Sequence, residues 1–123
     1  MQDLISIVDD DPSVCRAVGT LVRSLGYPVR MFGSAEQFLE SEAVPRTACV
    51  ITDLPMPGMS GLDLQHHLLT AGIVVPLIFL AANAEPGIVQ AAFAAGAVAF
   101  HDKPFDSDTL ASSIARALSD DAA

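Results

Sequence analysis

The sequence predicts a doubly wound α/β fold, in which a five-stranded parallel sheet carries helices on both of its faces. Five short apolar runs alternate along the chain with five stretches of helical character, an alternation typical of βαβ units. The runs are rich in β-branched residues and lack a regular polar alternation, as expected for strands buried on both faces. We therefore expect the carboxyl ends of all strands to meet at one edge, where such folds bind ligands.

The first strand and the first helix are marked by residues that favour their ends. The apolar run 4–8 predicts a strand, and three consecutive aspartates follow it. Asp11 and Pro12 predict a helix N-cap with proline at the first helical position. An apolar stripe at helical spacing continues to Gly26, which predicts a glycine C-cap.

The next unit is shorter. Residues 29–32 are expected to form the second strand. Ser34 and Gln37 lie three residues apart and predict a capping box for a helix that carries Phe38. We expect Pro45 to end this helix, because proline cannot continue the helical hydrogen bonds.

The second half of the chain repeats the strand–helix pattern three times. The expected strands cover residues 48–52, 74–80 and 97–100. The expected helices begin after the cap residue Ser60 and cover residues 61–69, 85–95 and 107–118. Pro76 leaves the start of the fourth strand open, since proline lacks the N–H that a central strand needs.

Length and composition indicate a single acidic domain over residues 1–123. Six Lys and Arg face fifteen Asp and Glu, which gives a formal net charge of −9. Direct contact with nucleic acid is not expected, because it depends on clustered basic residues. Hydrophobic residues make up 51% of the chain, which is enough for a core and argues against disorder.

The sequence also indicates a cytoplasmic protein with no membrane segment. No apolar run approaches the roughly 18 residues of a membrane-spanning helix. The first residues include Asp3 and no basic stretch, so a secretory signal is not expected. Cys15 and Cys49 are too few for a disulfide framework and lie in apolar surroundings, which favours a reduced compartment.

Acidic residues follow two of the expected strands. Asp9 and Asp10 follow the run 4–8, and Asp53 follows the run 48–52. Carboxylates that meet at one sheet edge repel each other unless a cation or a proton intervenes. Mg²⁺ prefers oxygen ligands, so these residues predict a magnesium site. Helix capping and a turn-starting role for Asp53 are the structural alternatives, and Asp11 fits the capping role.

Lys103 follows the fifth expected strand and precedes Pro104. A lysine there is able to pair with the carboxylates or with an oxyanion bound beside them. The alternative is a solvated surface lysine. The Lys103–Pro104 bond is a candidate cis peptide, since bonds before proline tolerate this form.

Four segments in this order resemble the receiver domain of two-component response regulators, which share the flavodoxin-like fold of the chemotaxis regulator CheY. They read V-D-D-D-P-S-V at 8–14, T-D-L-P-M-P-G-M-S-G-L-D-L at 52–64, A-G-A-V-A-F at 95–100 and D-K-P-F at 102–105. The resemblance extends over essentially the whole chain. The M-P-G-M-S-G loop and the F-x-x-K-P-F ending are similar to the nitrogen-fixation (FixJ-like) group, whose receivers are usually joined to a helix-turn-helix domain.

The resemblance implies a phosphorylation site. Asp53 would accept a phosphoryl group from a sensor histidine kinase, in a protein that is a switch and not an enzyme with a diffusible substrate. Asp10 would bind Mg²⁺ (or Mn²⁺) directly, and Asp9 would help through a water molecule. The backbone carbonyl of Pro55 would complete the protein ligands.

The resemblance also implies a phosphate-contacting group and a switch, and here the sequence departs from the family. Lys103 and the backbone of Ala82 would contact the phosphoryl oxygens, and Phe100 would be the aromatic switch. Receivers normally carry Thr or Ser where this chain has Ala81, so the hydroxyl arm of the switch is missing. Pro55 is also unusual, because its ring fixes φ beside the site. We therefore expect phosphorylation with a weakened conformational response.

The region 85–102 is expected to form the output surface. Nine of the 19 residues from 81 to 99 are alanine, so its helix should be lightly anchored by Ile88, Val89 and Phe93. Small apolar groups near Phe100 would suit a homodimer contact.

Two other functions remain open from the sequence. A pseudo-receiver would be an interaction module that no longer uses phosphate, and Ala81 and Pro55 are its support. A phosphatase resembling the haloacid dehalogenases would use Asp9 as nucleophile and Asp11 as general acid. That family needs a cap domain or a longer core and a second acidic pair near the C-terminus, which are not evident in this sequence.

Overall fold

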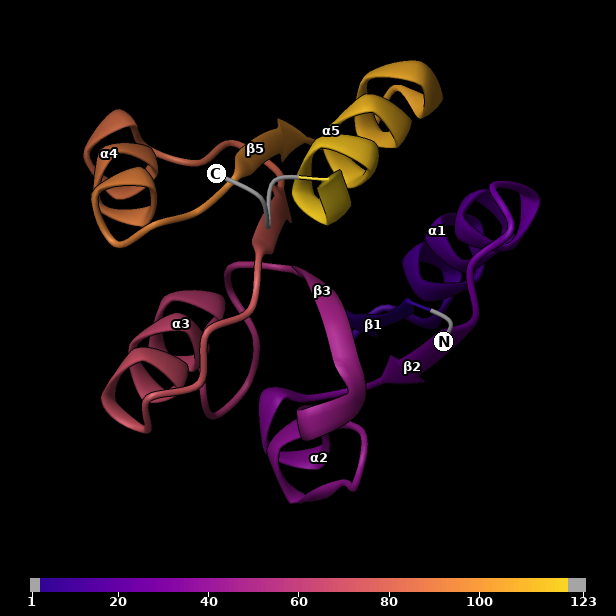
Figure 1. The fold of residues 1–123 in the computed structure, drawn as a ribbon. Helices are drawn as coiled ribbons and strands as arrows, with labels where there is room; N and C mark the ends of the chain where they lie inside the picture. Colours follow the sequence, from indigo (N-terminus) through magenta and orange to yellow (C-terminus); the bar gives the residue numbers. More distant parts are fainter. Residues whose placement is uncertain (1–2, 120–123) are drawn as a thin grey trace.

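The computed structural model describes residues 3–119, which form one parallel sheet flanked by helices (Figure 1). The strand order is β2-β1-β3-β4-β5, and all neighbouring pairs are parallel. The strands are β1 (Leu4–Val8), β2 (Val29–Phe32), β3 (Thr47–Thr52), β4 (Leu77–Ala81) and β5 (Ala99–Asp102). The helices are α1 (Pro12–Ser24), α2 (Ala35–Glu40), α3 (Gly61–Thr70), α4 (Pro86–Ala94) and α5 (Ser107–Ser119), with a 3₁₀ helix η1 (Val44–Arg46) before β3.

The doubly wound fold class expected from the sequence is therefore confirmed. Residues 1–2 and 120–123 of the expected 1–123 domain lie outside the described residues. Within residues 3–119, no helix has the length and apolar character needed to cross a membrane.

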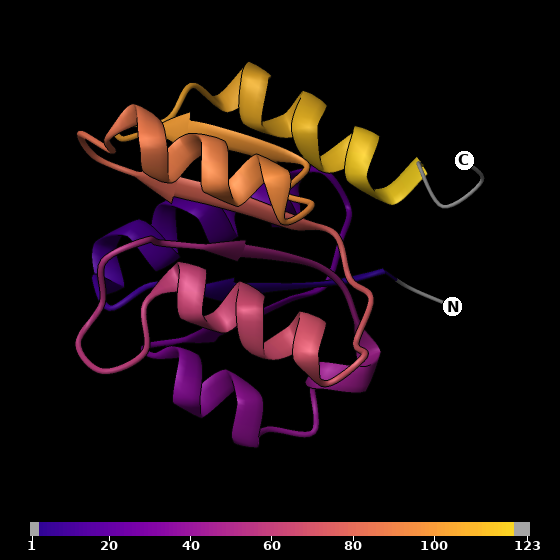
Figure 2. The ribbon, with the colours of Figure 1, turned by 90° about the vertical axis from the view of Figure 1, so that its left-hand side faces the viewer.

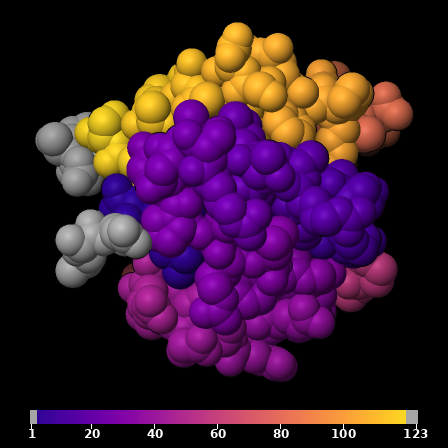
Figure 3. All heavy atoms as spheres, turned by 90° about the vertical axis from the view of Figure 1, so that its right-hand side faces the viewer, coloured from indigo at the N-terminus to yellow at the C-terminus, as the bar shows by residue number. Residues whose placement is uncertain are grey.

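Two apolar layers hold the helices against the sheet. Ile5, Ile7 and Ile51 point to the face covered by α1 and α5, where Cys15, Val18, Val22, Leu110 and Ile114 pack on them. Leu4, Val8 and Val50 point to the opposite face, where Phe38, Leu64, Leu68 and Ala92 of α2, α3 and α4 cover them. Figure 2 looks onto α2, α3 and α4, and Figure 3 shows α1 in the middle of the other side with α5 along its top. The alternation of strand side chains thus supplies both cores.

The expected helix caps at Asp11, Ser34 and Ser60 are present. The Asp11 carboxylate accepts the N–H of Ser13, and Pro12 opens α1. Ser34 Oγ accepts the N–H of Gln37 at 3.1 Å, but the Gln37 side chain returns to the N–H of Gly33 and not to that of Ser34. Ser60 and Asp63 form a complete capping box on α3.

Gly26 ends the α1 segment with φ 94°, in the left-handed region that glycine tolerates.

Three expected boundaries were wrong, each for a local reason. β4 begins at Leu77 and not at residue 74. Pro76 has no N–H to donate and pairs with β3 only through its carbonyl, which accepts the N–H of Val50. β5 covers Ala99–Asp102 and not residues 97–100, because Ala97 still bonds to Ala92 in the turn that ends α4. α2 ends at Glu40 and not at Pro45, because Ser41 is extended and its hydroxyl donates to the carbonyl of Phe38 and accepts the N–H of Ala43.

α4 is lightly anchored, as its alanine content suggested. Ala92 is the one residue of this helix that is fully buried. The expectation that Phe93 anchors the helix was wrong, since 46% of this side chain is exposed. The buried Gln65 of α3 provides a polar contact instead, because its Nε2 donates to the carbonyl of Ala92 at 3.0 Å.

Candidate functional site

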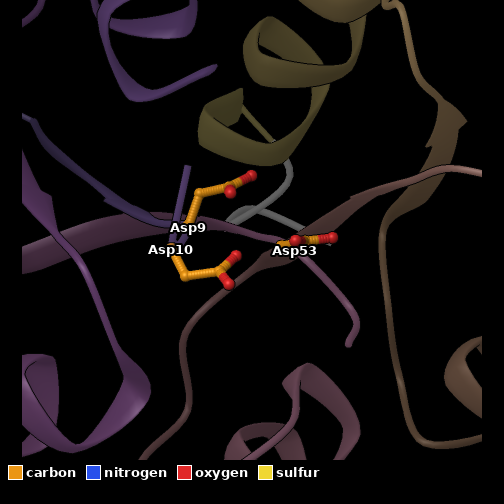
Figure 4. A group of neighbouring side chains, drawn as sticks. All are labelled: Asp9, Asp10 and Asp53. Atoms are coloured by element: carbon orange, nitrogen blue, oxygen red, sulfur yellow. The ribbon is translucent and has the colours of Figure 1, made fainter. Parts of the chain in front are cut away.

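Three carboxylates meet at the carboxyl edge of the sheet. Asp9 and Asp10 follow β1, and Asp53 follows the neighbouring strand β3, where its N–H donates to the carbonyl of Val8 at 2.9 Å. One carboxylate oxygen from each of the three residues lies within 4.8 Å of the others. Figure 4 shows Asp9 and Asp10 extending from the end of β1 toward the side where Asp53 lies. The structure therefore brings together the acidic residues expected from the sequence.

Lys103 follows the edge strand β5, and its side chain reaches two of these carboxylates. Its Nζ lies 3.0 Å from Asp9 Oδ2 and 3.2 Å from Asp53 Oδ2. Its backbone N–H donates to the carbonyl of Ala81 at 3.0 Å, which ties the segment after β5 to the end of β4. The Lys103–Pro104 bond is cis, as expected. Lys103 is thus part of the acidic site and not a solvated surface residue.

The surroundings of the site raise the pKa values of both Asp9 and Lys103, for different reasons. Burial raises the pKa of Asp9, and hydrogen bonds from Asp11 and Lys103 offset only part of that rise. Burial lowers the pKa of Lys103, but the carboxylates of Asp9 and Asp53 together raise it above its usual value. The pKa of Asp9 thus rises because its carboxylate is buried, whereas the pKa of Lys103 rises because one ammonium faces the carboxylates of Asp9 and Asp53.

The donor set fits a hard divalent cation. Asp9 Oδ1 accepts the N–H of Asp11, and Asp53 Oδ1 accepts the N–H of Leu54, so the carboxylates are held in place by the backbone. The three carboxylates have one ammonium beside them, which contacts Asp9 and Asp53, and Asp10 is exposed to solvent. Oxygen ligands with an excess negative charge are what Mg²⁺ requires.

A comparison with protein families identifies the domain. Residues 5–115 match the model of the response regulator receiver domain. The chain belongs to this family. Receiver domains act in two-component systems, where they interact with sensor histidine kinases, bind Mg²⁺ through acidic residues and are characteristically phosphorylated on aspartate.

Individual relatives agree with this membership and include the FixJ group. The response regulator protein TmoT of Ectopseudomonas mendocina is 40% identical over 117 residues, which cover 95% of this chain and 53% of that protein. Among solved structures, response regulator StyR has a TM-score of 0.91 at 34% identity, covering 99% of this chain and 62% of that one. The FixJ-N structure has a TM-score of 0.85 at 32% identity, covering 97% and 95%. The chain spans about half the length of the curated relatives it matches.

The residues expected to contact phosphate or to switch lie at or near the carboxyl ends of β3, β4 and β5. Ala81 ends β4 and is fully buried, and its methyl group has no hydrogen-bonding capacity. Ala82 follows it and is exposed. Phe100 is half-buried on β5 and stacks on Phe79 of β4, with 5.4 Å between ring centroids. Pro55 lies exposed in the loop after Asp53.

Asp11 is engaged elsewhere, which removes support from the phosphatase alternative. Its carboxylate accepts hydrogen bonds from the N–H and the Oγ of Ser13, and these bonds lower its pKa. Among the described residues, the acidic group able to hold a metal contains Asp9, Asp10 and Asp53 but not Asp11. Asp11 therefore acts as the cap that the sequence indicated.

Gly61 is a positioning residue that the sequence reasoning missed. It is the first residue of α3, and its N–H donates to the carbonyl of Leu54 at 2.7 Å. A Cβ at this position would collide with the backbone carbonyl of Asp53 and press on the ring of Phe79. The segment S-G-L-D contained Gly61, but only the fold shows that its missing side chain lets α3 approach Asp53.

We predict that Gly61→Ala destabilises the domain by about 1–3 kcal/mol, because the extra methyl group overpacks the backbone of Asp53. Gly87→Ala is the matched control, since Gly87 also lies in the first turn of a helix but has open space around it. That control should be neutral or stabilising by up to about 1 kcal/mol. Urea unfolding measures both, and equal stability of the two variants would contradict the packing assigned to Gly61.

We predict that Asp9→Asn stabilises the metal-free domain near neutral pH. Because the pKa of Asp9 is raised on folding, its ionisation costs stability at high pH, and protonation relieves that cost as the pH falls through the raised pKa. The advantage of the variant should therefore shrink between about pH 7 and about pH 4. Urea unfolding in a chelator at several pH values measures it, and a less stable variant at neutral pH would show that the ion pair with Lys103 outweighs burial.

Proposed function

We propose that this receiver domain accepts a phosphoryl group on Asp53 from a histidine kinase, with Mg²⁺ (or Mn²⁺) bound beside it. The observation that carries the proposal is the position of Lys103 Nζ, within 3.2 Å of both Asp9 and Asp53, next to a third carboxylate. Phosphoryl transfer depends mainly on positioning and on neutralising spread negative charge, which this arrangement serves.

Each residue has a defined part in the transfer. A carboxylate oxygen of Asp53 attacks the phosphorus of a phosphohistidine, the P–N bond breaks, and its electron pair stays on the imidazole. Asp9, Asp10 and Asp53, with the backbone carbonyl of Pro55, would hold the metal ion. When bound, the ion neutralises charge on the phosphoryl oxygens. Lys103, already paired with Asp53, remains in place to bind an oxygen of the new acyl phosphate.

We expect phosphorylation to be coupled only weakly to the output surface. The hydroxyl that receivers normally use is replaced by the methyl group of Ala81, while the exposed residue Ala82 would offer its backbone for phosphate contact. A full reversal of a switch from 1:99 to 99:1 needs about 5.5 kcal/mol of differential stabilisation. A missing hydrogen bond to a charged group removes about 1.5–3 kcal/mol of that. We therefore propose phosphorylation with weakened switching at Phe100.

The output surface that we propose is a homodimer contact through residues 85–102. An open hollow of about 500 Å³ lies over β5 between α4 and α5, and its lining includes Phe93, Phe100 and His101. Phe93 exposes 46% of its side chain there, and α4 has few buried residues to resist a shift. A weakly held face that combines the apolar Phe93 and Phe100 with polar residues of α5 suits a symmetric contact between two copies.

The position of Asp53, the net charge and the buried cysteines support our proposals for the partners and the cellular location. The kinase would approach the edge that carries Asp53 and α1. The net charge of −9 supports a domain that makes no direct contact with nucleic acid. The buried thiols of Cys15 and Cys49 are free, and burial raises the pKa of Cys49 to about 12, which is consistent with the proposed reduced, cytoplasmic setting.

We predict that acetyl phosphate and Mg²⁺ add one phosphoryl group to the parent protein and none to Asp53→Asn, as read by intact-protein mass. Asp108→Asn is the control, because Asp108 is an exposed aspartate on α5, away from the acidic group. Phosphorylation of Asp53→Asn to the parent's extent would show that Asp53 is not the acceptor. Failure of the parent itself would favour the pseudo-receiver.

We predict that phosphorylation changes dimerisation little in the parent and more in Ala81→Thr, which restores a hydroxyl at the end of β4. The restored bond should tighten the phosphorylation-dependent dimer by about ten- to hundredfold. Light scattering over a dilution series measures this. A large shift in the parent would refute weakened switching, and a monomer at every concentration in both proteins would refute the dimer.

A further inference from the structure

The loop between β3 and α3, residues 54–60, carries the carbonyl of Pro55 and is held at both ends by its own neighbours. At its start, the Leu54 N–H donates to Asp53 and its carbonyl accepts the N–H of Gly61. At its end, Ser60 forms the capping box with Asp63. The side chain of Met56 is buried in the core, but apolar contacts are not directional. The middle of the loop therefore needs a polar contact to fix its path.

Glu36 of α2 supplies that contact from 23 residues away in the sequence. Its Oε2 accepts the backbone N–H of Met59 at 3.0 Å. The same carboxylate lies against Gly58, where a Cβ would fall 2.6 Å from Oε2. Gly58 has φ 78°, a conformation that favours glycine, and the Glu36 carboxylate fills the space where a side chain would begin. Among the described residues, this is the one side-chain hydrogen bond that reaches the loop from outside residues 53–63.

Two prolines limit the backbone torsions of the loop, so the hydrogen bond at Met59 also restricts the residues that precede it. Pro55 and Pro57 have φ fixed near −65° by their rings, which removes two soft torsions between Asp53 and Met59. Gly58 is the most permissive residue of the loop, and it lies directly against the Glu36 carboxylate. Fixing the peptide between Gly58 and Met59 therefore restricts the orientation of the Pro55 carbonyl upstream.

We propose that Glu36 is a positioning residue, which holds the loop 54–60 so that the Pro55 carbonyl faces the metal site formed by Asp9, Asp10 and Asp53. This inference rests on the proposed function, because it assumes that Mg²⁺ binds there. Glu36 acts through a hydrogen bond and not through its charge. Its removal should weaken metal binding more than it weakens the fold.

Two conservative variants separate position from charge. Glu36→Asp keeps the charge but shortens the side chain, so it loses the bond to Met59. Glu36→Gln loses the charge but keeps an acceptor oxygen at the same reach. Outer-shell partners of metal ligands change affinity by about 10–100-fold when mutated. We expect Glu36→Asp to bind Mg²⁺ about tenfold more weakly, and Glu36→Gln to retain most of the parent's affinity.

Calorimetric titration with Mg²⁺ measures these affinities, and phosphorylation by acetyl phosphate over a range of Mg²⁺ concentrations provides the second readout. Glu36→Asp should need more Mg²⁺ but reach the parent's extent at saturation. Glu40→Asp and Glu40→Gln, on the exposed side of the same helix, are the matched controls and should behave as the parent does.

The outcomes separate this inference from the function on which it rests. Unchanged affinity in Glu36→Asp would overturn the inference, and so would the reverse pattern, with Glu36→Gln weakened and Glu36→Asp normal, since that points to charge. A parent protein that binds no Mg²⁺ would instead overturn the proposed function. Urea unfolding of each variant shows whether the fold is retained, and a loss of affinity that only follows a loss of stability also counts against positioning.

Discussion

The repulsion among three carboxylates at one sheet edge is the constraint on which the site depends. Asp9 and Asp53 are almost fully buried, with 3% and 6% exposure, and they share one ammonium group. Buried charge of one sign costs folding free energy unless it is compensated. The two apolar layers supply the stability that tolerates this cost. In the function that we propose, the same imbalance would favour a divalent cation and a transferred phosphoryl group beside it.

The backbone around Asp53 keeps this acidic group in place without relying on the cation. The N–H groups of Asp11 and Leu54 hold one oxygen each of Asp9 and Asp53. α3 begins against the Asp53 carbonyl, which Gly61 permits because it has no side chain. Short bonds to the backbone fix the carboxylates more tightly than flexible side chains would, so the site is ordered before any ligand arrives.

The packing of α4 is looser than that of the acidic site. α4 contributes a single fully buried residue, and Gln65 ties it to α3 by one hydrogen bond. Phe100 is half-buried, stacks on Phe79 and lines the open hollow between α4 and α5. A rigid acceptor site beside a weakly held helix suits a switch. A small difference in free energy between two conformations is enough to shift the population of a helix that is held by few contacts. In the switch that we propose, Ala81 would remove one source of that energy.

The sequence alone determined the alternation of strands and helices, the caps at Asp11 and Ser60, and the acidic residues that end β1 and β3, because these depend on local periodicity and on the parallel-sheet rule. It misplaced the ends of β4 and β5, where Pro76 and the turn after α4 decide which backbone groups remain free to pair. The fold alone decided that Lys103 pairs with Asp9 as well as Asp53, that Gly61 admits α3 and that Glu36 holds the loop. The reason is physical: these contacts depend on how separate elements pack against one another, and the order and register of the strands decide that packing.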